Sequence, residues 1–118
     1  MKNDFKNKFS FETRKKESDR IKSKYNDRIP IIVTRSKNCN IEKIDKNKFL
    51  VPEDLTIGQF LFVIRKRISI KPEESLFLMI NGDILATSSN TIGSTYHDYK
   101  DEDGFLYFTY CGENVFGN

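Results

Sequence analysis

The clearest structural signal in the sequence is an amphipathic helix that we expect to begin at Thr56. Isoleucine, phenylalanine and leucine recur after it at positions 57, 60, 61, 64 and 68, a spacing that places apolar side chains on one helix face. Thr56 and Gln59 fit a capping box, in which each side chain accepts a hydrogen bond from the other residue's backbone N–H. The basic residues 65–67 place positive charge in the last turn, where it stabilises the helix dipole. The pattern predicts one helix packed over a core.

The segment before this helix predicts two strands. Residues 29–34 are rich in β-branched side chains. Because Pro30 lacks a backbone N–H, it is restricted to the start of its strand or to a sheet edge. Residues 48–52 predict a second, short strand that ends at Pro52.

The segment after the helix predicts two further strands. Residues 76–80 form a continuous apolar run, which is typical of a strand covered on both faces, and residues 81–83 predict a turn. The polar residues 87–95 predict a surface loop. Residues 105–110 carry aromatic side chains on both faces, which favours a central strand. Two strands, a crossing helix and two more strands follow the order of the β-grasp, an α+β fold.

Residues 1–27 differ from the rest because their apolar positions are sparse. Phe5 and Phe9, and then Ile21 and Tyr25, are spaced four apart, which predicts two short helices with narrow apolar stripes. We therefore expect a β-grasp with two additional N-terminal helices. Residues 1–27 would form an extension packed on a β-grasp domain of residues 28–118.

The net charge of +3 is unevenly distributed along the chain. Residues 1–27 hold nine Lys/Arg against five Asp/Glu, a local +4, whereas residues 95–118 hold one Lys against five Asp/Glu, a local −4. The basic part is either a solvated face or a surface for acidic peptides or anionic lipid. Nucleic-acid binding is not expected, because the aromatic residues are patterned as core.

The sequence indicates no catalytic or metal site. His97 is the sole histidine and adjoins Asp98 in a predicted loop; a pairing with Cys111 is conceivable in space, but no nucleophile motif surrounds that cysteine. The acidic run 101–103 is expected to be solvated charge. Cys39 and Cys111 are expected to be reduced thiols. We therefore expect neither enzyme activity nor a cofactor.

No signal peptide or membrane-spanning segment is evident in the sequence. A cytoplasmic protein is expected. Attachment to a membrane would then require a covalent anchor or a partner.

Several motifs resemble, in order and spacing, the autophagy ubiquitin-like modifiers, the family of the GABA-receptor-associated protein and the yeast autophagy modifier. The resemblance spans essentially the whole chain. It rests on Phe11-Glu12 with Arg14, YNDRIPIIV at 25–33, KNKFLVPEDLTIGQF at 46–60 with IRKR at 64–67, DGFLY at 103–107 and GENVFG at 112–117.

The resemblance implies a ubiquitin-like fold and a conjugation tail. A cysteine protease would cleave between Gly117 and Asn118, and activating and conjugating enzymes would then transfer Gly117 to phosphatidylethanolamine. A glycine suits this chemistry, because its carbonyl is unhindered and its lack of a Cβ lets it enter a narrow channel. The resemblance implies a monomer that is recruited to autophagosomal or other vesicle membranes once lipidated.

The resemblance also implies docking of cargo receptors that carry an acidic-flanked motif of the form aromatic-x-x-aliphatic. The motif would add as a strand to the edge formed by residues 48–51. The pocket for the aromatic residue would comprise Glu17, Ile21, Pro30, Ile32, Lys48, Leu50 and Phe105. The pocket for the aliphatic residue would comprise Phe49, Val51, Pro52, Leu55, Phe60 and Val63. The cations that would meet the acidic flank are Arg28, Lys46, Lys48 and Arg67.

One alternative stays open from the sequence. The chain would be a scaffold that is not conjugated and uses only its peptide groove, in vesicle trafficking or on microtubules. Gly117→Ala and Leu50→Ala distinguish the two hypotheses, because only the modifier needs Gly117.

Overall fold

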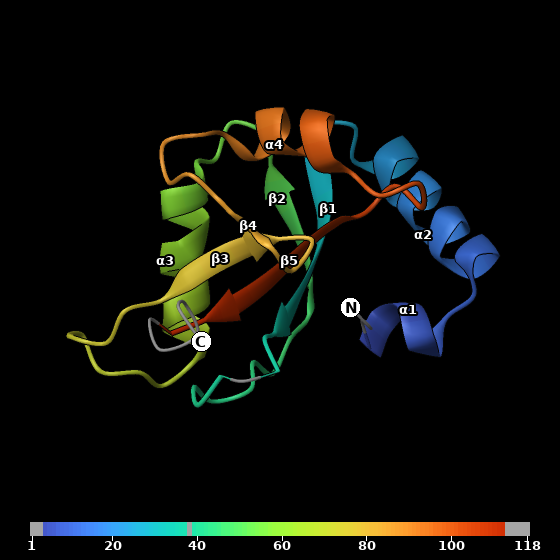
Figure 1. Ribbon diagram of the computed structural model, residues 1–118. Coiled ribbons are helices and arrows are strands. Elements are labelled where there is room, and N and C mark those ends of the chain that lie inside the picture. The colour runs from blue at the N-terminus through green and yellow to red at the C-terminus, as the bar shows by residue number, and fades with distance from the viewer. Residues whose placement is uncertain (1–3, 38, 113–118) are drawn as a thin grey trace.

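The computed structural model describes residues 4–37 and 39–112. In chain order its elements are α1 (Asp4–Lys8), α2 (Phe11–Lys24), β1 (Arg28–Arg35), β2 (Lys48–Pro52), α3 (Ile57–Arg67), β3 (Phe77–Ile80), β4 (Ile84–Leu85), α4 (Ile92–Tyr99) and β5 (Leu106–Cys111). Figure 1 shows the sheet between α3 on one side and α1 and α2 on the other. This is the predicted α+β, ubiquitin-like arrangement with two N-terminal helices.

The five strands form one mixed sheet in the order β2-β1-β5-β3-β4. Strand β5 is central and wholly buried, as predicted from its aromatic residues. It runs parallel to β1, and its pairing with β1 begins at Ile31 and Leu106. Pro30 precedes that first pair, so the missing N–H removes no bond to β5.

Helix α3 closes the main core on one face of the sheet. Thr56 caps it, and both hydrogen bonds of the predicted capping box with Gln59 are present. Ile57, Phe60 and Ile64 are buried against the sheet. The ring of Phe60 meets that of Phe49 edge to face, with the centroids 5.5 Å apart. Burying one such side chain stabilises the fold by roughly 2–3 kcal/mol, so the predicted apolar stripe accounts for the position of the helix.

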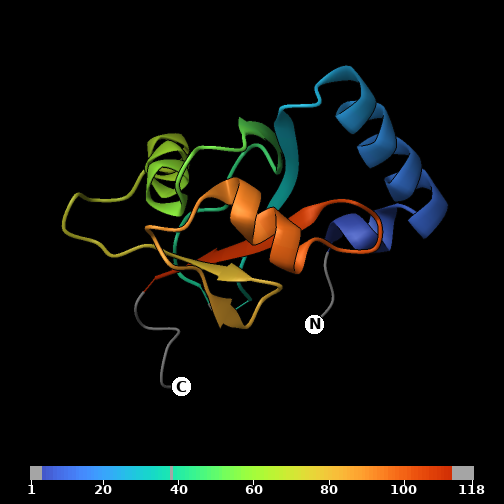
Figure 2. The ribbon, with the colours of Figure 1, turned by 90° about the horizontal axis from the view of Figure 1, so that it is seen from above.

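Helices α1 and α2 pack on the opposite face through a second, smaller apolar cluster. Figure 2 shows both helices on the side of the sheet away from α3. The cluster joins Phe5 of α1 and Ile21 of α2 to Ile32, Phe105 and Tyr107 of the sheet region. Of the four residues predicted to form the two stripes, Phe5 and Ile21 dock these helices, whereas Phe9 and Tyr25 are 42% and 40% exposed.

The β3–β4 hairpin confirms the predicted turn and corrects one expectation about the strand before it. Asn81 and Gly82 have φ values of 54° and 85°, the left-handed pair that a tight hairpin turn requires. Strand β3 was expected to be covered on both faces. Leu78 and Ile80 are buried, but Phe77 and Met79 are only half-buried, because the cluster beneath α1 and α2 extends no further than β1 and β5.

Helix α4 was missed, and the surface loop expected over 87–95 is wrong in its second half. Thr91 caps α4 by accepting a hydrogen bond from the Ser94 N–H. Ile92, Tyr96 and Tyr99 recur at helical spacing, but only Ile92 of the three is buried, and the Ser/Thr/Asn-rich residues that precede them favoured a loop. The segment is held by backbone bonds to the start of α3, including one from the Ile57 N–H to the Asn90 carbonyl at 2.8 Å.

Candidate peptide-docking site and conjugation tail

Strand β2 is an outer strand of the sheet. The Val33 N–H donates to the Asn47 carbonyl at 2.8 Å. Along an antiparallel strand, residues whose backbone groups bond the neighbouring strand alternate with residues whose backbone groups point away from it. Because Asn47 bonds β1, the backbone groups of Lys48 and Leu50 point away from β1. Pro52 has no backbone N–H and therefore ends the series of outward-pointing backbone groups. The edge therefore offers two residues with free backbone groups for an added strand.

Three of the predicted aromatic-pocket residues lie in the apolar floor beneath α2. Ile21, Ile32 and Phe105 belong to the second cluster, and none is more than 1% exposed. They supply a closed apolar base beside the edge strand and little open surface.

The other four members of this pocket lie around that floor. Pro30 is paired with Leu50 across β1 and β2, so the two side chains share one face. Leu50 is exposed, and Lys48 is half-buried on the same face. Glu17 of α2 accepts a bond from the Lys48 ammonium at 2.8 Å. The structure thus brings together all seven residues that the sequence placed here.

A hollow of about 410 Å³ adjoins this pocket between α1 and α2. Phe5, Phe9, Thr13 and Arg14 line it, together with the Glu17–Lys48 pair. Glu17 and Lys48 line this hollow and also belong to the predicted aromatic pocket. Their ion pair therefore lies at the boundary between the hollow and the pocket.

Most of the predicted aliphatic-pocket residues lie on the α3 side of β2, but Pro52 alternates with Lys48 and Leu50 and so lies on the opposite face of the strand. Phe49, Val51 and Phe60 are buried in the main core, where they form a floor. Pro52 and Leu55 are half-buried. Val63 of α3 is 38% exposed. Because successive side chains of a strand point to opposite faces, β2 presents one pocket on each side.

The four predicted cations divide between the two ends of the edge. Lys46 lies 5.0 Å from the Phe49 ring centroid. Arg67 approaches the same ring at 6.0 Å and pairs with Asp45 at 3.3 Å. Arg28 is at the other end, paired with Pro52. Lys46, Lys48 and Arg67 are therefore grouped, whereas Arg28 stands apart.

Glu17 of α2 is the carboxylate that forms the ion pair between α2 and β2. It bonds Arg20 in a bidentate pair at 3.0 and 3.1 Å and also bonds Lys48. The hydrogen bonds from Arg20 and Lys48 lower the pKa of the Glu17 carboxyl from 4.5 to about 2. The carboxylate is therefore ionised throughout the physiological pH range and fixes the position of Lys48.

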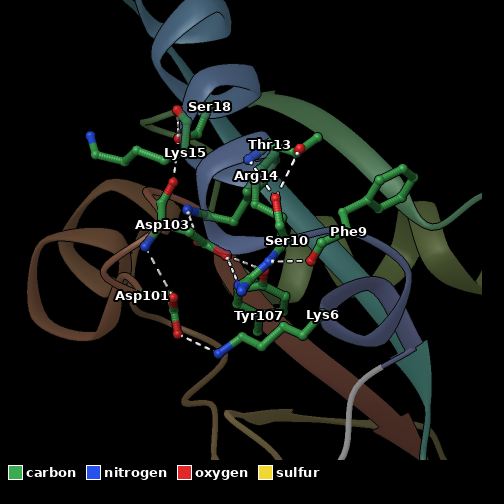
Figure 3. Close-up of polar contacts among 11 residues, drawn as sticks. Lys6, Phe9, Ser10, Thr13, Arg14, Lys15, Ser18, Asp101, Asp103 and Tyr107 are labelled. Carbon is green, nitrogen blue, oxygen red and sulfur yellow. Dashed lines mark hydrogen bonds and ion pairs between the residues drawn. The ribbon is translucent and has the colours of Figure 1, made fainter.

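The sequence did not predict the buried network that holds α2 on the sheet, shown in Figure 3. Asp103 was expected to be solvated, yet it is 0% exposed. Its carboxylate accepts bonds from Arg14 at 2.6 Å, from the Tyr107 hydroxyl and from the Phe105 N–H at 2.9 Å. The Ser18 hydroxyl donates to the Asp103 carbonyl. Sequence alone gave no signal for this network, because Arg14 and Ser18 of α2 are 89 and 85 positions from Asp103 in the chain.

Gly104 and Tyr107 allow the Asp103 carboxylate to be buried. Gly104 has a φ of +92°, and a Cβ there would overlap the Ser18 hydroxyl. Burial, followed by the hydrogen bond to Asp103, raises the pKa of the Tyr107 phenol, which keeps it a donor. Lys6 of α1 pairs with Asp101 at 2.6 Å and so joins α1 to the same loop.

Cys111 and His97 cannot form a catalytic pair. His97 lies in α4, not in the predicted loop, and lines a depression with Gly104 at the start of β5. Cys111 ends that strand, roughly 20 Å away at about 3.3 Å per residue. Cys39 and Cys111 are buried free thiols, and burial raises the pKa of Cys111. Both features disfavour the reactive thiolate.

Comparison with known proteins identifies the family. The model of the family described as "Autophagy protein Atg8 ubiquitin like" matches residues 13–117. The chain belongs to the Atg8 family. It is 52% identical to autophagy-related protein 8 of Schizosaccharomyces pombe over 117 residues, which are 99% of this chain and 96% of that protein. The corresponding protein of Cochliobolus heterostrophus is 50% identical, over 99% of this chain and 98% of its own length.

A solved member of the Atg8 family has the same fold. The crystal structure of Trypanosoma brucei ATG8 is similar to this chain with a TM-score of 0.90 and 42% identity, covering 96% of this chain and 97% of the other. The chain is therefore a ubiquitin-like modifier of autophagy with the lipidation and cargo-adaptor role of its family, and it is not an enzyme. The autophagy conjugation system supplies its partners, and localisation to autophagosomes is typical of the family.

Two observations bear on how such a protein reaches a membrane. Among the described residues, no helix is long and apolar enough to span a bilayer. The predicted conjugation and cleavage residues, Gly117 and Asn118, lie outside the described residues.

The low pKa of Glu17 gives a pH-dependent prediction. A carboxyl whose pKa is lowered on folding stabilises the fold fully above its unfolded pKa of 4.5, and this stabilisation is lost as the pH falls toward about 2. We expect Glu17→Gln to lower the free energy of unfolding at pH 6 and to differ little from the parent protein near pH 2. Urea denaturation at intermediate pH values measures the convergence.

Glu12→Gln is the matched control. Glu12 lies on the same helix, is exposed and forms no ion pair with the described residues. A stability difference for Glu17→Gln that stayed constant from pH 6 to pH 2 would contradict the ion-pair origin of the effect.

Proposed function

We propose that this Atg8-family chain docks acidic-flanked aromatic-x-x-aliphatic motifs on the β2 edge and is conjugated through Gly117 to phosphatidylethanolamine. The observation that carries the docking proposal is the position of β2. It is an outer strand with an apolar floor on each face. An extended peptide added to this strand would place alternate side chains on the two faces.

The motif spacing fits the arrangement of the two pockets. Lys48 and Leu50 belong to the aromatic pocket on one face of β2, whereas Val51 and Leu55 belong to the aliphatic pocket on the other face, toward the end of the strand. An aromatic residue followed three positions later by an aliphatic one falls on opposite faces of an extended strand. The peptide would therefore run parallel to β2, with its N-terminal flank beyond Lys48.

Conjugation would require two covalent steps at the chain end. A cysteine protease first hydrolyses the Gly117–Asn118 peptide bond with one water molecule, which releases Asn118 and exposes the Gly117 carboxylate. Activation of this carboxylate consumes a nucleoside triphosphate, which provides the leaving group, and the activating and conjugating enzymes then carry Gly117 as an acyl group bound to an enzyme side chain. The amine of phosphatidylethanolamine attacks that carbonyl, an amide forms, and the enzyme group leaves. A lipid with two acyl chains supplies a stable anchor.

The proposed binding partners and cellular location of the protein follow from motif docking and lipid conjugation. Cargo receptors would bind at the β2 edge, and the protein would be a cytoplasmic monomer until lipidation moves it to autophagosomal or other vesicle membranes. We also propose that residues 1–27 and 28–118 work as one compact unit, because Phe5 of α1 and Ile21 of α2 pack in one apolar cluster with Ile32, Phe105 and Tyr107.

Docking on the β2 edge is tested by Leu50→Ala. Leu50 is 36% exposed, so its truncation removes contact area in the aromatic pocket at little cost to folding. We expect roughly a tenfold or greater rise in the Kd for a synthetic motif peptide, since losing a buried interface anchor costs about 1–2 kcal/mol. Isothermal titration calorimetry measures it.

Leu85→Ala is the control for this variant. Leu85 is 53% exposed on β4, at the opposite edge of the sheet. Equal losses of affinity in Leu50→Ala and Leu85→Ala would place the peptide elsewhere.

Conjugation is tested by Gly117→Ala in nutrient-starved cells. We expect the parent protein recovered from membranes to lack Asn118 and to carry one phosphatidylethanolamine, as measured by intact mass. We expect Gly117→Ala to yield no such species, because the added methyl group hinders both processing and transfer.

A chain that ends at Gly117 separates processing from conjugation, and it should be lipidated without protease. Recovery of full-length, unmodified parent protein from membranes would contradict conjugation and favour the unconjugated peptide-binding scaffold.

A further inference from the structure

The two cysteines of the chain lie at the same end of the sheet. Cys111 is the last residue of β5, and Cys39 lies in the segment that joins β1 to β2. Both are buried free thiols, and both belong to the main core cluster. Neither thiol belongs to the docking pockets, and the proposed function uses neither.

Backbone hydrogen bonds bring Cys39 to the end of β5. Arg35 is paired with Tyr110 across the parallel strands β1 and β5. The Ser36 N–H donates to the Tyr110 carbonyl at 3.0 Å, and the Cys39 N–H donates to the Ser36 carbonyl at 3.2 Å. Cys39 is therefore one turn away from Ser36, which lies beside the end of β5 where Cys111 is placed.

The phenol of Tyr110 fixes the segment that carries Cys39. Its hydroxyl donates to the Glu42 carbonyl at 2.6 Å and accepts from the Ile44 N–H at 2.8 Å. Tyr110 is fully buried and directly precedes Cys111 in β5. The described residues between β1 and β2 form no helix or strand, so bonds of this kind hold the segment over the end of β5.

Ile41 connects the surroundings of the two thiols. Its N–H donates to the Cys39 Sγ at 3.4 Å. A Cβ at Gly112, the residue after Cys111, would lie 3.2 Å from the Ile41 side chain. Burial, followed by the proximity of Cys39, raises the pKa of the Cys111 thiol. The two thiols therefore lie within electrostatic reach of each other.

We propose that Cys39 and Cys111 form a reversible disulfide under oxidising conditions, and that this bond locks residues 39–44 to the end of β5. A disulfide needs Cα atoms within roughly 7 Å of each other. Neighbouring strands are about 4.8 Å apart, and a turn brings residues three apart to within roughly 7 Å. Cys39 therefore needs at most a small shift within an irregular segment to reach Cys111.

The oxidant would be a low-molecular-weight disulfide such as glutathione disulfide. Cys39 is 9% exposed and Cys111 is 0% exposed, so Cys39 is the thiol that a reagent reaches first. The Cys39 thiolate attacks one sulfur of the oxidant, whose S–S bond breaks, and one thiolate leaves. The Cys111 thiolate then attacks the Cys39 sulfur, the protein disulfide forms, and the second thiolate leaves. Two protein thiols are oxidised, and their protons pass to the two thiols released from the oxidant.

The bond would lock the base of the predicted conjugation tail, because Gly117 follows six positions after Cys111. It would also close a long loop of the chain, which restricts the unfolded state far more than the folded one. The lock should therefore form more favourably in the folded chain than in the unfolded chain. This inference does not depend on motif docking or on conjugation.

The thiol–disulfide equilibrium of the full chain tests the lock. The chain is equilibrated at several ratios of glutathione to glutathione disulfide, in native buffer and in concentrated urea, until its intact mass no longer changes, because burial slows exchange. We expect the equilibrium constant for the Cys39–Cys111 bond to be roughly 30-fold or more larger in native buffer than in urea. The Tm of the oxidised chain should exceed that of the reduced chain by roughly 5 °C or more.

Cys39→Ser/Asn40→Cys is the matched control. It moves one thiol by a single position to Asn40, which is exposed, and keeps the number of cysteines unchanged. In urea this variant should form its disulfide about as readily as the parent protein, because the loop that it closes is nearly the same. In native buffer it should lose the enhancement.

Three outcomes would overturn the inference. The first is an equilibrium constant no larger in native buffer than in urea, which would mean that the folded geometry opposes the bond. The second is native oxidation that stops at glutathione adducts or that links two chains. The third is an equal native enhancement in the control variant. None of these outcomes would affect the tests with Leu50→Ala and Gly117→Ala.

Discussion

The buried carboxylate of Asp103 fixes the position of α2, on which the aromatic pocket and its boundary depend. A charge with no exposed surface costs several kcal/mol to desolvate unless partners compensate it. Asp103 has Arg14 from α2, the Tyr107 hydroxyl from β5 and the Phe105 N–H as partners. Because Arg14, the one cation among these partners, lies 89 positions away in the chain, the charge is compensated only when α2 lies over the sheet.

The docking edge depends on this placement. With α2 in position, Ile21 closes the apolar floor, and Glu17 reaches Lys48 across the boundary to β2. The other side of β2 is set independently by α3, whose Phe60 packs on Phe49. One outer strand thus acquires an apolar floor on each face from two helices that belong to different parts of the chain. The proposed docking of short motifs rests on that geometry.

Much of this arrangement could be predicted from the sequence because it depends on local patterns. The stripe and capping box of α3, the Asn81-Gly82 turn and the short strand ending at Pro52 are each specified by neighbouring residues. What could not be predicted depends on distant contacts. Helix α4 follows a polar, loop-like segment and buries little apolar surface besides Ile92, and it is held by backbone bonds to the start of α3.

The candidate site divides in the same way. The residues assigned to the two pockets by family resemblance lie together in space, but the resemblance did not distinguish buried floor from exposed rim. Phe105 is fully buried, whereas Leu50 is open to a ligand. Asp103 appeared to be one residue of a solvated acidic run, and only the three-dimensional structure shows that Arg14 is beside it.

The most direct test of the central role of Asp103 is hydrogen exchange in Asp103→Asn, with Glu102→Gln as the exposed neighbouring control. Loss of this charge leaves Arg14 without its buried partner, so we expect faster exchange across the amides of α2 while α3 keeps its protection. The affinity for a motif peptide should fall in parallel. Unchanged protection of α2 in Asp103→Asn would contradict the dependence of the docking site on this buried carboxylate.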